Sequence, residues 1–162
     1  VQGIGGTHGG MGCCFWWSAG PYTNPGTIYG AALGPLTLGS GGDCAYGVQS
    51  QGSGGGAIKL TAGGLITVNG RITANGTNGT LNTQGGAGGS IWISGPRLVG
   101  AGWISASGGT SDNYYGAGGG SGRIDISQTT NDFAGPLQVY PALGLMGGLG
   151  GSLLCPPRMG PA

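Results

Sequence analysis

The acidic residues and the single histidine are the side chains of this chain with the clearest capacity for chemistry. Hydrolysis or lysis of a polysaccharide needs paired carboxylates, or a carboxylate–metal cluster, on one face. The sequence contains no Glu, and its acidic residues are Asp43, Asp112, Asp125 and Asp132. Asp125 and Asp132 lie close in sequence, but acids at this spacing are usually separately solvated.

Nucleophilic catalysis and phosphate binding also lack their usual patterns. His8 has no Ser or Asp partner at a recognisable spacing. The glycine runs contain no GxxxxGK[ST] motif, so they resemble phosphate-binding loops only in composition. We therefore expect that the chain is not an enzyme and that it uses no cofactor.

The four cysteines have a spacing that favours disulfides over a metal site. No CxxC pair occurs and no second His joins His8, so we expect no metal centre. An even number of cysteines in a glycine-rich, charge-poor chain favours disulfides in an oxidising compartment. Adjacent cysteines scarcely pair with each other without strain. The three pairings and the alternative of buried free thiols all stay open for Cys13, Cys14, Cys44 and Cys155.

Two Asn-Gly-Thr triplets point to secretion in the same way. Asn75 and Asn78 both fit the acceptor pattern for N-glycosylation. The alternative is that these Asn-Gly pairs form ordinary turns.

Composition and charge exclude several classes of protein. Of 162 residues, 44 are Gly and 9 are Pro, but glycine does not recur at every third position, as collagen requires. The aliphatic residues form orderly short runs and charges are few, unlike in disordered chains. The net charge is +1, with no basic stripe for nucleic acid. No apolar run approaches the length of a membrane-spanning segment.

The ends and the low charge of the chain lead to two further expectations. The chain begins VQGIGG, with neither Met nor a signal peptide, and we expect a processed product or a piece of something longer. A surface with so little charge has weak protection against self-association.

The elements that would position these residues repeat with a period of 33. Ile58, Ile91 and Ile124 are separated by equal gaps of 33 residues, and each opens a short apolar alternation after glycine. Such a period indicates a chain that coils and stacks on itself. We therefore predict an all-β fold, a parallel β-helix with about three 33-residue rungs and long glycine-rich loops.

Three columns of strands are expected within this repeat. Inward ladders of Ile58/Ile91/Ile124 and Leu60/Ile93/Ile126 form the first, with Lys59/Trp92/Asp125 and Thr61/Ser94/Ser127 facing outward. The second joins 65–68 to Leu98 and Val99, and the third joins Ile72, Ile104 and Leu137. Segments 77–89 and 109–122 are expected to be loops that form one glycine-rich surface.

We divide the chain into three parts on this basis. Residues 1–50 form an irregular segment with Cys and aromatic residues, 51–140 the β-helical rungs, and 141–162 a Gly/Pro-rich tail or cap. The tail can cap a strand edge because proline donates no ladder hydrogen bond. A tail that lies on the next subunit is equally compatible.

Four stretches resemble a glycine-rich repeat of very large secreted or surface proteins of bacteria and some protists. They are residues 29–42, 52–76, 85–109 and 118–127, so the resemblance extends over roughly residues 29–140. It implies a parallel β-helical, adhesin-like or structural protein that is not enzymatic, and no functional residue can be carried over from it. The segment CCFWW (13–17) departs from the pattern.

The aromatic residues are candidates for self-association. Large aromatics are prominent at interface hot spots, although an aromatic plug at one end of the coil is the simpler interpretation of 13–17. Trp92 and Trp103 could add a stacking surface for carbohydrate or a neighbouring subunit. The self-association candidates are Phe15, Trp16, Trp17, Tyr114 and Tyr115.

We expect from these observations an extracellular or cell-surface structural protein. Its subunit would be a β-solenoid that self-assembles head to tail into a filament, sheath or surface appendage, with itself as partner. The alternative is an adhesin-type module that binds a surface or glycan through its loop face. An ice-binding variant is disfavoured because no column of Thr persists between rungs.

Overall fold

All regular elements in the described residues are β-strands. The computed structural model describes residues 2–4, 6–10, 12, 14–16, 27–43, 51–80, 83–111, 117–142 and 152–154. None of these residues forms a helix that could cross a membrane. The strands are β1 (Gln2–Ile4), β2 (Cys14–Trp16), β3 (Ala57–Thr61), β4 (Leu65–Thr67), β5 (Arg71–Thr73), β6 (Ser90–Gly100), β7 (Trp103–Ser105), β8 (Arg123–Phe133), β9 (Leu137–Gln138) and β10 (Ser152–Leu154).

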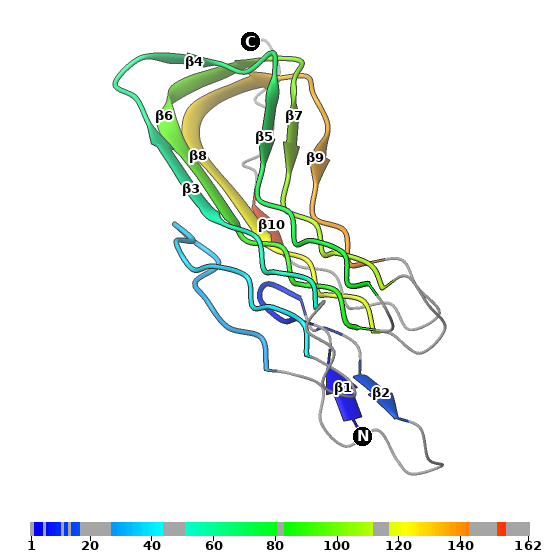
Figure 1. Ribbon diagram of the computed structural model, residues 1–162. Helices are drawn as coiled ribbons and strands as arrows, with labels where there is room; N and C mark the ends of the chain where they lie inside the picture. The colour runs from blue at the N-terminus through cyan, green and yellow to red at the C-terminus, as the bar shows by residue number, and fades with distance from the viewer. Residues whose placement is uncertain are drawn as a thin grey trace.

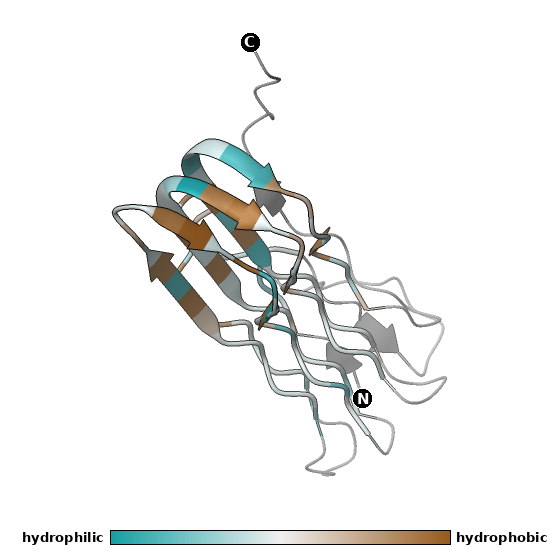
Figure 2. Cartoon of the chain, turned by 90° about the horizontal axis from the view of Figure 1, so that it is seen from above, coloured by the Kyte–Doolittle hydropathy of each residue, from teal (hydrophilic) through white to brown (hydrophobic). Residues whose placement is uncertain are grey.

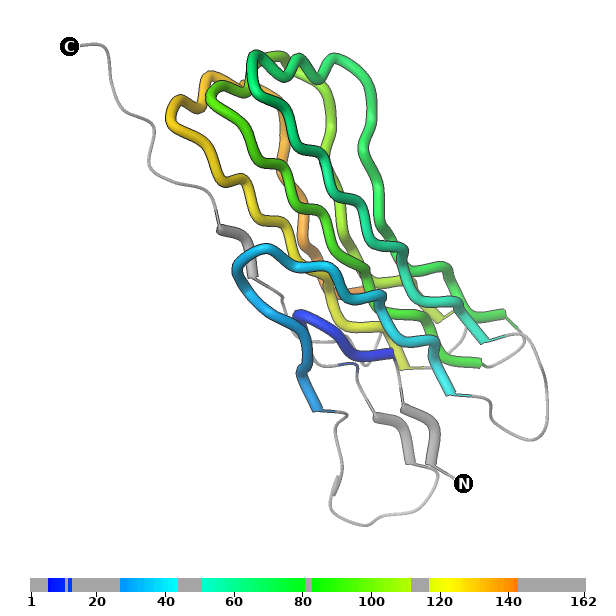
Figure 3. The backbone as a smooth tube through the Cα atoms, turned by 90° about the vertical axis from the view of Figure 1, so that its left-hand side faces the viewer, coloured from blue at the N-terminus to red at the C-terminus, as the bar shows by residue number. Residues whose placement is uncertain are grey.

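The strands β3 to β9 form three stacked tiers (Figures 1 and 3). Tier 1 contains β3, β4 and β5, tier 2 contains β6 and β7, and tier 3 contains β8 and β9. One parallel sheet has the order β10-β8-β6-β3, with β4 also paired to β6, and a second has the order β5-β7-β9. In Figure 1 the strands of these two sheets lie on opposite sides of the upper part of the molecule. The pair β1–β2 is antiparallel.

The register of the tiers confirms the predicted ladders. Ile58 pairs with Ile91 and Ile91 with Ile124, so the first column steps by 33 residues. In the other sheet Ile72 pairs with Ile104 and Ile104 with Leu137. The all-β class and these two columns were therefore correctly predicted from the sequence.

The second column differs by one residue between tiers 1 and 2. Thr61 pairs with Ser94, but Leu65 pairs with Arg97, so three residues intervene in tier 1 and two in tier 2. The extra residue lies in 62–64, where a Cβ at Gly63 or Gly64 would meet no atom within 4 Å. The exposed insertion separates β3 from β4, whereas β6 continues through the same bend.

Aliphatic side chains of both sheets meet in one core. Ile91, Ile93, Leu98, Ile104, Ile124 and Ile126 are completely or almost completely buried. β-Branched residues suit this position because they pack well on a pleated surface. Figure 2 shows the hydrophobic residues concentrated on the strands, whereas the glycine-rich part of the molecule is pale. The tier-1 residues Ile58, Ile66 and Ile72 pack against the core but are only partly buried.

Below the strands, glycine-rich segments pack into what we call the glycine bundle, residues 6–10, 39–42, 51–56, 74–80, 83–89, 106–110 and 117–122. Three consecutive N–H groups, those of residues 85–87, donate to three different segments. The next two N–H groups, of residues 88 and 89, return to the first two of these segments, three residues later in the first and three residues earlier in the second. The acceptors, in order from residue 85, are the carbonyl oxygens of Ala117, Thr77, Ser40, Gly120 and Ala74, at 2.7–3.0 Å. A period of three residues is that of the polyproline II helix, which leaves all its hydrogen-bonding groups for neighbours.

Glycine is required in this bundle by close approach of the backbones. A Cβ built at Gly88 would collide with the carbonyl oxygen of Ala106, and one at Gly89 with that of Gly56. Neither glycine has a positive φ, so space and not backbone conformation is the constraint. The same reason places glycine at the axis of collagen.

The prediction that 77–89 and 109–122 form surface loops was therefore wrong for most of their described residues. Residues 83–89 and 117–122 are buried, and their main-chain groups bond to neighbouring segments. A buried segment without side chains can satisfy its polar groups only through such pairing. These glycine runs predict loops because glycine commonly marks turns, and the pattern alone does not distinguish a turn from a buried, closely packed segment.

Candidate functional site

A buried polar cluster lies where the glycine bundle meets the sheet. His8 Nδ1 is 3.0 Å from the carbonyl oxygen of Gly88, and its Nε2 is 2.7 Å from Thr37 Oγ1. Because a carbonyl only accepts, Nδ1 carries the proton and Nε2 accepts from the Thr37 hydroxyl. Ser90 Oγ donates to the carbonyl oxygen of Thr37 at 2.6 Å and is 3.4 Å from His8 Nε2.

This Ser–His pair is enclosed. Both His8 and Ser90 are 0% exposed, so neither side chain reaches solvent. The Ser90 proton is directed to the main chain of Thr37, whereas an activated nucleophile would direct its proton to the base. The cluster in this form holds three segments of the chain together.

Burial sets the charge state of the cluster. It lowers the pKa of His8 below the ordinary value of 6.5, and the positive charge of Arg123 lowers that pKa further, against the opposing effect of the Gly88 carbonyl. Burial also raises the pKa of Tyr29, whose ring centroid is 5.1 Å from that of His8. His8 is therefore neutral in the folded protein near neutral pH.

The segment 27–38 covers the outer face of the sheet beside this cluster. Gly34 donates its N–H to Asp125 Oδ2 at 2.7 Å, and Arg123 Nη2 donates to the carbonyl oxygen of Tyr29 at 3.1 Å. Gly34 has a φ of +57°, and a Cβ built on it would meet the Trp92 ring at 3.4 Å. The outward face of tier 3, expected to be exposed, is buried here because an N-terminal segment lies on it.

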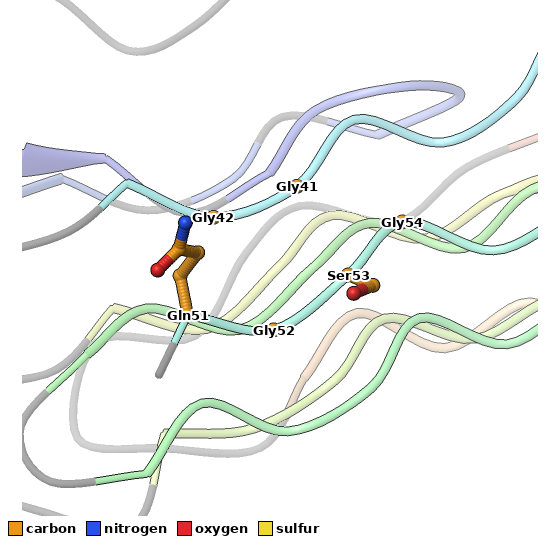
Figure 4. Close-up of a pocket in the computed structure, with 6 residues that line it drawn as sticks. All are labelled: Gly41, Gly42, Gln51, Gly52, Ser53 and Gly54. Atoms are coloured by element: carbon orange, nitrogen blue, oxygen red, sulfur yellow. The ribbon is translucent and has the colours of Figure 1, made fainter. Parts of the chain in front are cut away.

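A shallow hollow lies between segments 41–42 and 51–54 (Figure 4). Its volume is about 500 Å³, and among the described residues that line it only Gln51 and Ser53 have side chains. The Ser53 N–H is bonded to Thr77 Oγ1 at 2.7 Å. No titratable residue lines the described part of this hollow, so it offers main-chain groups and two neutral side chains to a ligand.

The free edge of tier 1 is the strongest candidate for an interaction surface. Within the described chain no strand pairs with the outer edge of β3 or of β5. Ile66 on this tier is only partly buried, whereas its tier-2 partner Leu98 is buried, and Leu65 is 59% exposed, as its own partner Arg97 also is exposed. An exposed strand edge with apolar side chains is a template for a further strand.

Two hydrogen bonds at the ends of the β3–β6 pairing show which main-chain groups of β3 point to the free edge. Ser90 donates to the carbonyl of Gly56, and Ala62 donates to the carbonyl of Ser94. Even-numbered residues of β3 thus bond to β6. Because a strand alternates, the N–H and C=O groups of Lys59 and Thr61 point to the free edge.

Two cation–π pairs join tier 1 to tier 2. Lys59 Nζ lies 4.1 Å from the Trp92 ring centroid, and Arg71 Cζ lies 4.4 Å from that of Trp103. The cations thus cover the rings, which leaves less aromatic surface for the carbohydrate stacking that the sequence suggested.

The structure separates the acidic residues considered for catalysis. Asp125 accepts hydrogen bonds from Gly34 N–H and Ser127 Oγ, and Asp132 forms a 2.7 Å ion pair with Arg97. Asp43 is exposed, and Asp112 lies outside the described residues. No three His, Cys, Asp or Glu side chains gather around a common point in the described ranges.

The candidate glycosylation residues are exposed and bonded to the next tier. Asn75 Oδ1 accepts from Ser105 Oγ at 2.7 Å and from the Ser107 N–H at 2.8 Å. Asn78 Oδ1 accepts from the Thr110 N–H at 2.9 Å. Both side chains therefore extend main-chain pairing between tiers, a role that the sequence analysis did not anticipate.

The remaining candidates fall wholly or partly outside the described residues. Cys14, Phe15 and Trp16 form β2, for which the backbone pairing to β1 is described. The disulfide, aromatic-plug and self-association predictions stay predictions. The candidate residues that lie outside the described ranges are Cys13, Cys44, Cys155, Trp17, Tyr114 and Tyr115.

Comparison of the chain with family models, with curated proteins and with solved structures finds no match. The resemblance to a glycine-rich surface-protein repeat therefore stays a prediction, and functional inference rests on the geometry above.

Proposed function

We propose that the protein is an extracellular structural subunit, a parallel β-helix that assembles head to tail into a filament, sheath or surface appendage. The parallel register of three tiers, repeated in two sheets that share one core, supports the β-helix. The low net charge of +1 supports self-association. The enclosure of the Ser–His pair supports a role without catalysis.

The observation that carries this proposal is the unfinished state of tier 1. Ile58, Ile66 and Ile72 contact the core but are only partly buried, whereas Ile91, Leu98 and Ile104, their partners in tier 2, are buried. Burial of apolar surface contributes about 25 cal/mol per Å², so a further tier on this edge would stabilise both partners.

A second copy of the chain suits this edge because it supplies the same ladder. If tier 3 of one copy meets tier 1 of the next in register, Ile124 comes beside Ile58 and Leu137 beside Ile72. These pairs repeat the Ile91–Ile124 and Ile104–Leu137 pairs within one chain. A head-to-tail contact of this kind does not close and therefore gives a filament.

Electron microscopy of the purified protein tests the proposal. We expect filaments with an axial subunit repeat of about 15 Å, since three tiers are spaced ~4.8 Å apart. Thr61→Pro should abolish them, because it removes an N–H that points to the free edge and spares the bonds to β6. Thr61→Ala, which keeps the N–H, is the matched control.

The outcomes separate assembly from folding. The Thr61→Pro variant should keep the circular dichroism spectrum of the wild type, which shows that the monomer is folded. Dispersed monomers of the wild type at all concentrations, or filaments of the Thr61→Pro variant, would contradict the proposal.

A second candidate function is an adhesin-type module, and one observation favours it. Segment 27–38 exposes apolar side chains, with Leu33 72% exposed. An exposed apolar patch is common at sites that bind surfaces or proteins. If the protein is monomeric, Leu33→Ser should weaken its adsorption to an apolar surface, measured by quartz-crystal microbalance. The exposed large hydrophobic residues of segment 27–38 are Ile28, Tyr29, Leu33, Leu36 and Leu38.

A further inference from the structure

The strand β10 occupies the beginning of a fourth tier. It pairs in parallel with β8, with Ser152 opposite Arg123, Leu153 opposite Ile124 and Leu154 opposite Asp125. In the same columns, tier 1 has Ala57, Ile58 and Lys59. A second copy that adds its β3 to the edge of β8 in register would therefore need the positions that β10 holds.

We propose that β10 is a displaceable cap that controls assembly by competing with β3 of a second copy for the edge of β8. The inference rests on the proposed function, since it names the surface and the partner of that assembly. The cap closes the first part of the edge in the free subunit and is released when the next subunit docks.

The number of paired positions favours replacement of β10 by tier 1 of a second copy. β10 pairs with β8 at three positions of a strand that spans Arg123–Phe133. A docking tier 1 can pair as it does with tier 2, over five positions of β3, three of β4 and three of β5. The incoming tier thus replaces each pairing that β10 loses and adds others along the same face.

Charge also favours the second copy over the cap. Lys59, Trp92 and Asp125 share one outward column. In the proposed junction Lys59 of the second copy pairs with Asp125, whereas the residue of β10 that pairs with Asp125 is Leu154. Opposite charges at directly adjacent cross-strand positions attract each other, and an uncharged residue supplies no such attraction.

The main-chain hydrogen-bonding groups on the two edges are in compatible positions. Arg123 donates its N–H to Gly89, so the main-chain groups of Arg123 and Asp125 face β6 and those of Ile124 and Ile126 face the opposite edge. Lys59 and Thr61 direct theirs to the free edge of tier 1. For β10, the same alternation places the Leu154 N–H on the carbonyl of Ile124.

The hydrogen bond from the Leu154 N–H to the Ile124 carbonyl can be tested with a pair of matched variants. Leu154→Pro removes the N–H that holds β10 to β8, and Leu154→Val keeps it together with an apolar side chain. Assembly of wild type and both variants is followed by light scattering at equal protein concentration. Leu154→Pro should assemble about tenfold faster, as expected for loss of one ordinary main-chain hydrogen bond. Leu154→Val should match the wild type.

The results separate this inference from the proposed function. Equal rates for wild type and Leu154→Pro, with filaments from both, would overturn the cap and leave the structural role intact. An absence of filaments from all three proteins would overturn the proposed function and the cap with it.

Hydrogen exchange on the wild type gives a measurement that needs no variant. A peptide containing 152–154 should be protected from exchange in the monomer and lose that protection in the filament. Protection retained after assembly would overturn the cap, because β10 would then still be paired with β8.

Discussion

The strand tiers and the glycine bundle belong to the same stack but are held together in different ways. In the tiers, aliphatic side chains such as Ile91 and Ile104 fill the space between two sheets. In the bundle, the backbones of residues 83–89 and 117–122 approach so closely that main-chain hydrogen bonds and a few side chains, most of them small, occupy the interior. The tiers therefore depend on which side chain is present, and the bundle depends on its absence.

This difference shows how a glycine-rich chain can avoid disorder. Glycine loses more conformational entropy on folding than other residues, and in most contexts this loss weakens structure. Here residues 85–89 each satisfy their N–H with a partner in another segment. The tiers fix the register of these segments, so the apolar half of each repeat orders the glycine half.

The largest effect is expected from a methyl group placed inside the bundle. Gly88→Ala should destabilise the protein by about 3 kcal/mol or more, because the Cβ meets backbone atoms that cannot move aside as a side chain would. Gly63→Ala, with nothing within 4 Å, is the matched control and should change stability by less than about 1 kcal/mol. Thermal unfolding followed by circular dichroism measures both, and equal melting temperatures would refute tight backbone packing.

A loss of similar or smaller size is expected from the opposite change in the tiers, where a side chain is removed. Ile104→Ala should cost about 2–5 kcal/mol, because it leaves a cavity in the shared core. Leu65→Ala, at a position 59% exposed in the free subunit, should cost much less. Urea denaturation of the monomer distinguishes the two. A similar cost for both would mean that Leu65 is covered in solution.

The smallest effect concerns the polar contact between the two regions. The lowered pKa of His8 means that the unfolded chain binds its proton more readily, so stability is complete above pH 6.5 and declines as the pH falls below it. His8→Gln retains a donor for Gly88 and an acceptor for Thr37. This variant should lose less stability than the wild type between about pH 7 and pH 5. Equal losses in melting temperature would place the acid-sensitive group elsewhere.

The strand ladders could be predicted from the sequence because their information is periodic. Equal gaps between Ile58, Ile91 and Ile124 specify both the partner and the register. The second column was predicted less accurately, since the extra residue at 62–64 is a local insertion that a fixed period does not show.

The glycine bundle was missed although a weak signal was present. In 84–90 the residues other than glycine are Gln84, Ala87 and Ser90, one at every third position. When glycine spacing is compared with the collagen pattern over the whole chain, a period of three confined to these residues is not visible. The coverage of Asp125 and Arg123 by 27–38 had no signal of this kind, because it depends on a segment outside the repeat.

The three directions of hydrogen bonding in the bundle have a mechanical consequence. A β-sheet has one hydrogen-bonding direction, so a shearing force can separate two strands along a single plane. In the bundle, residues 85–87 are each anchored to a different neighbour. Force applied to one segment is therefore distributed around it, and no single plane exists along which the segments can slide apart.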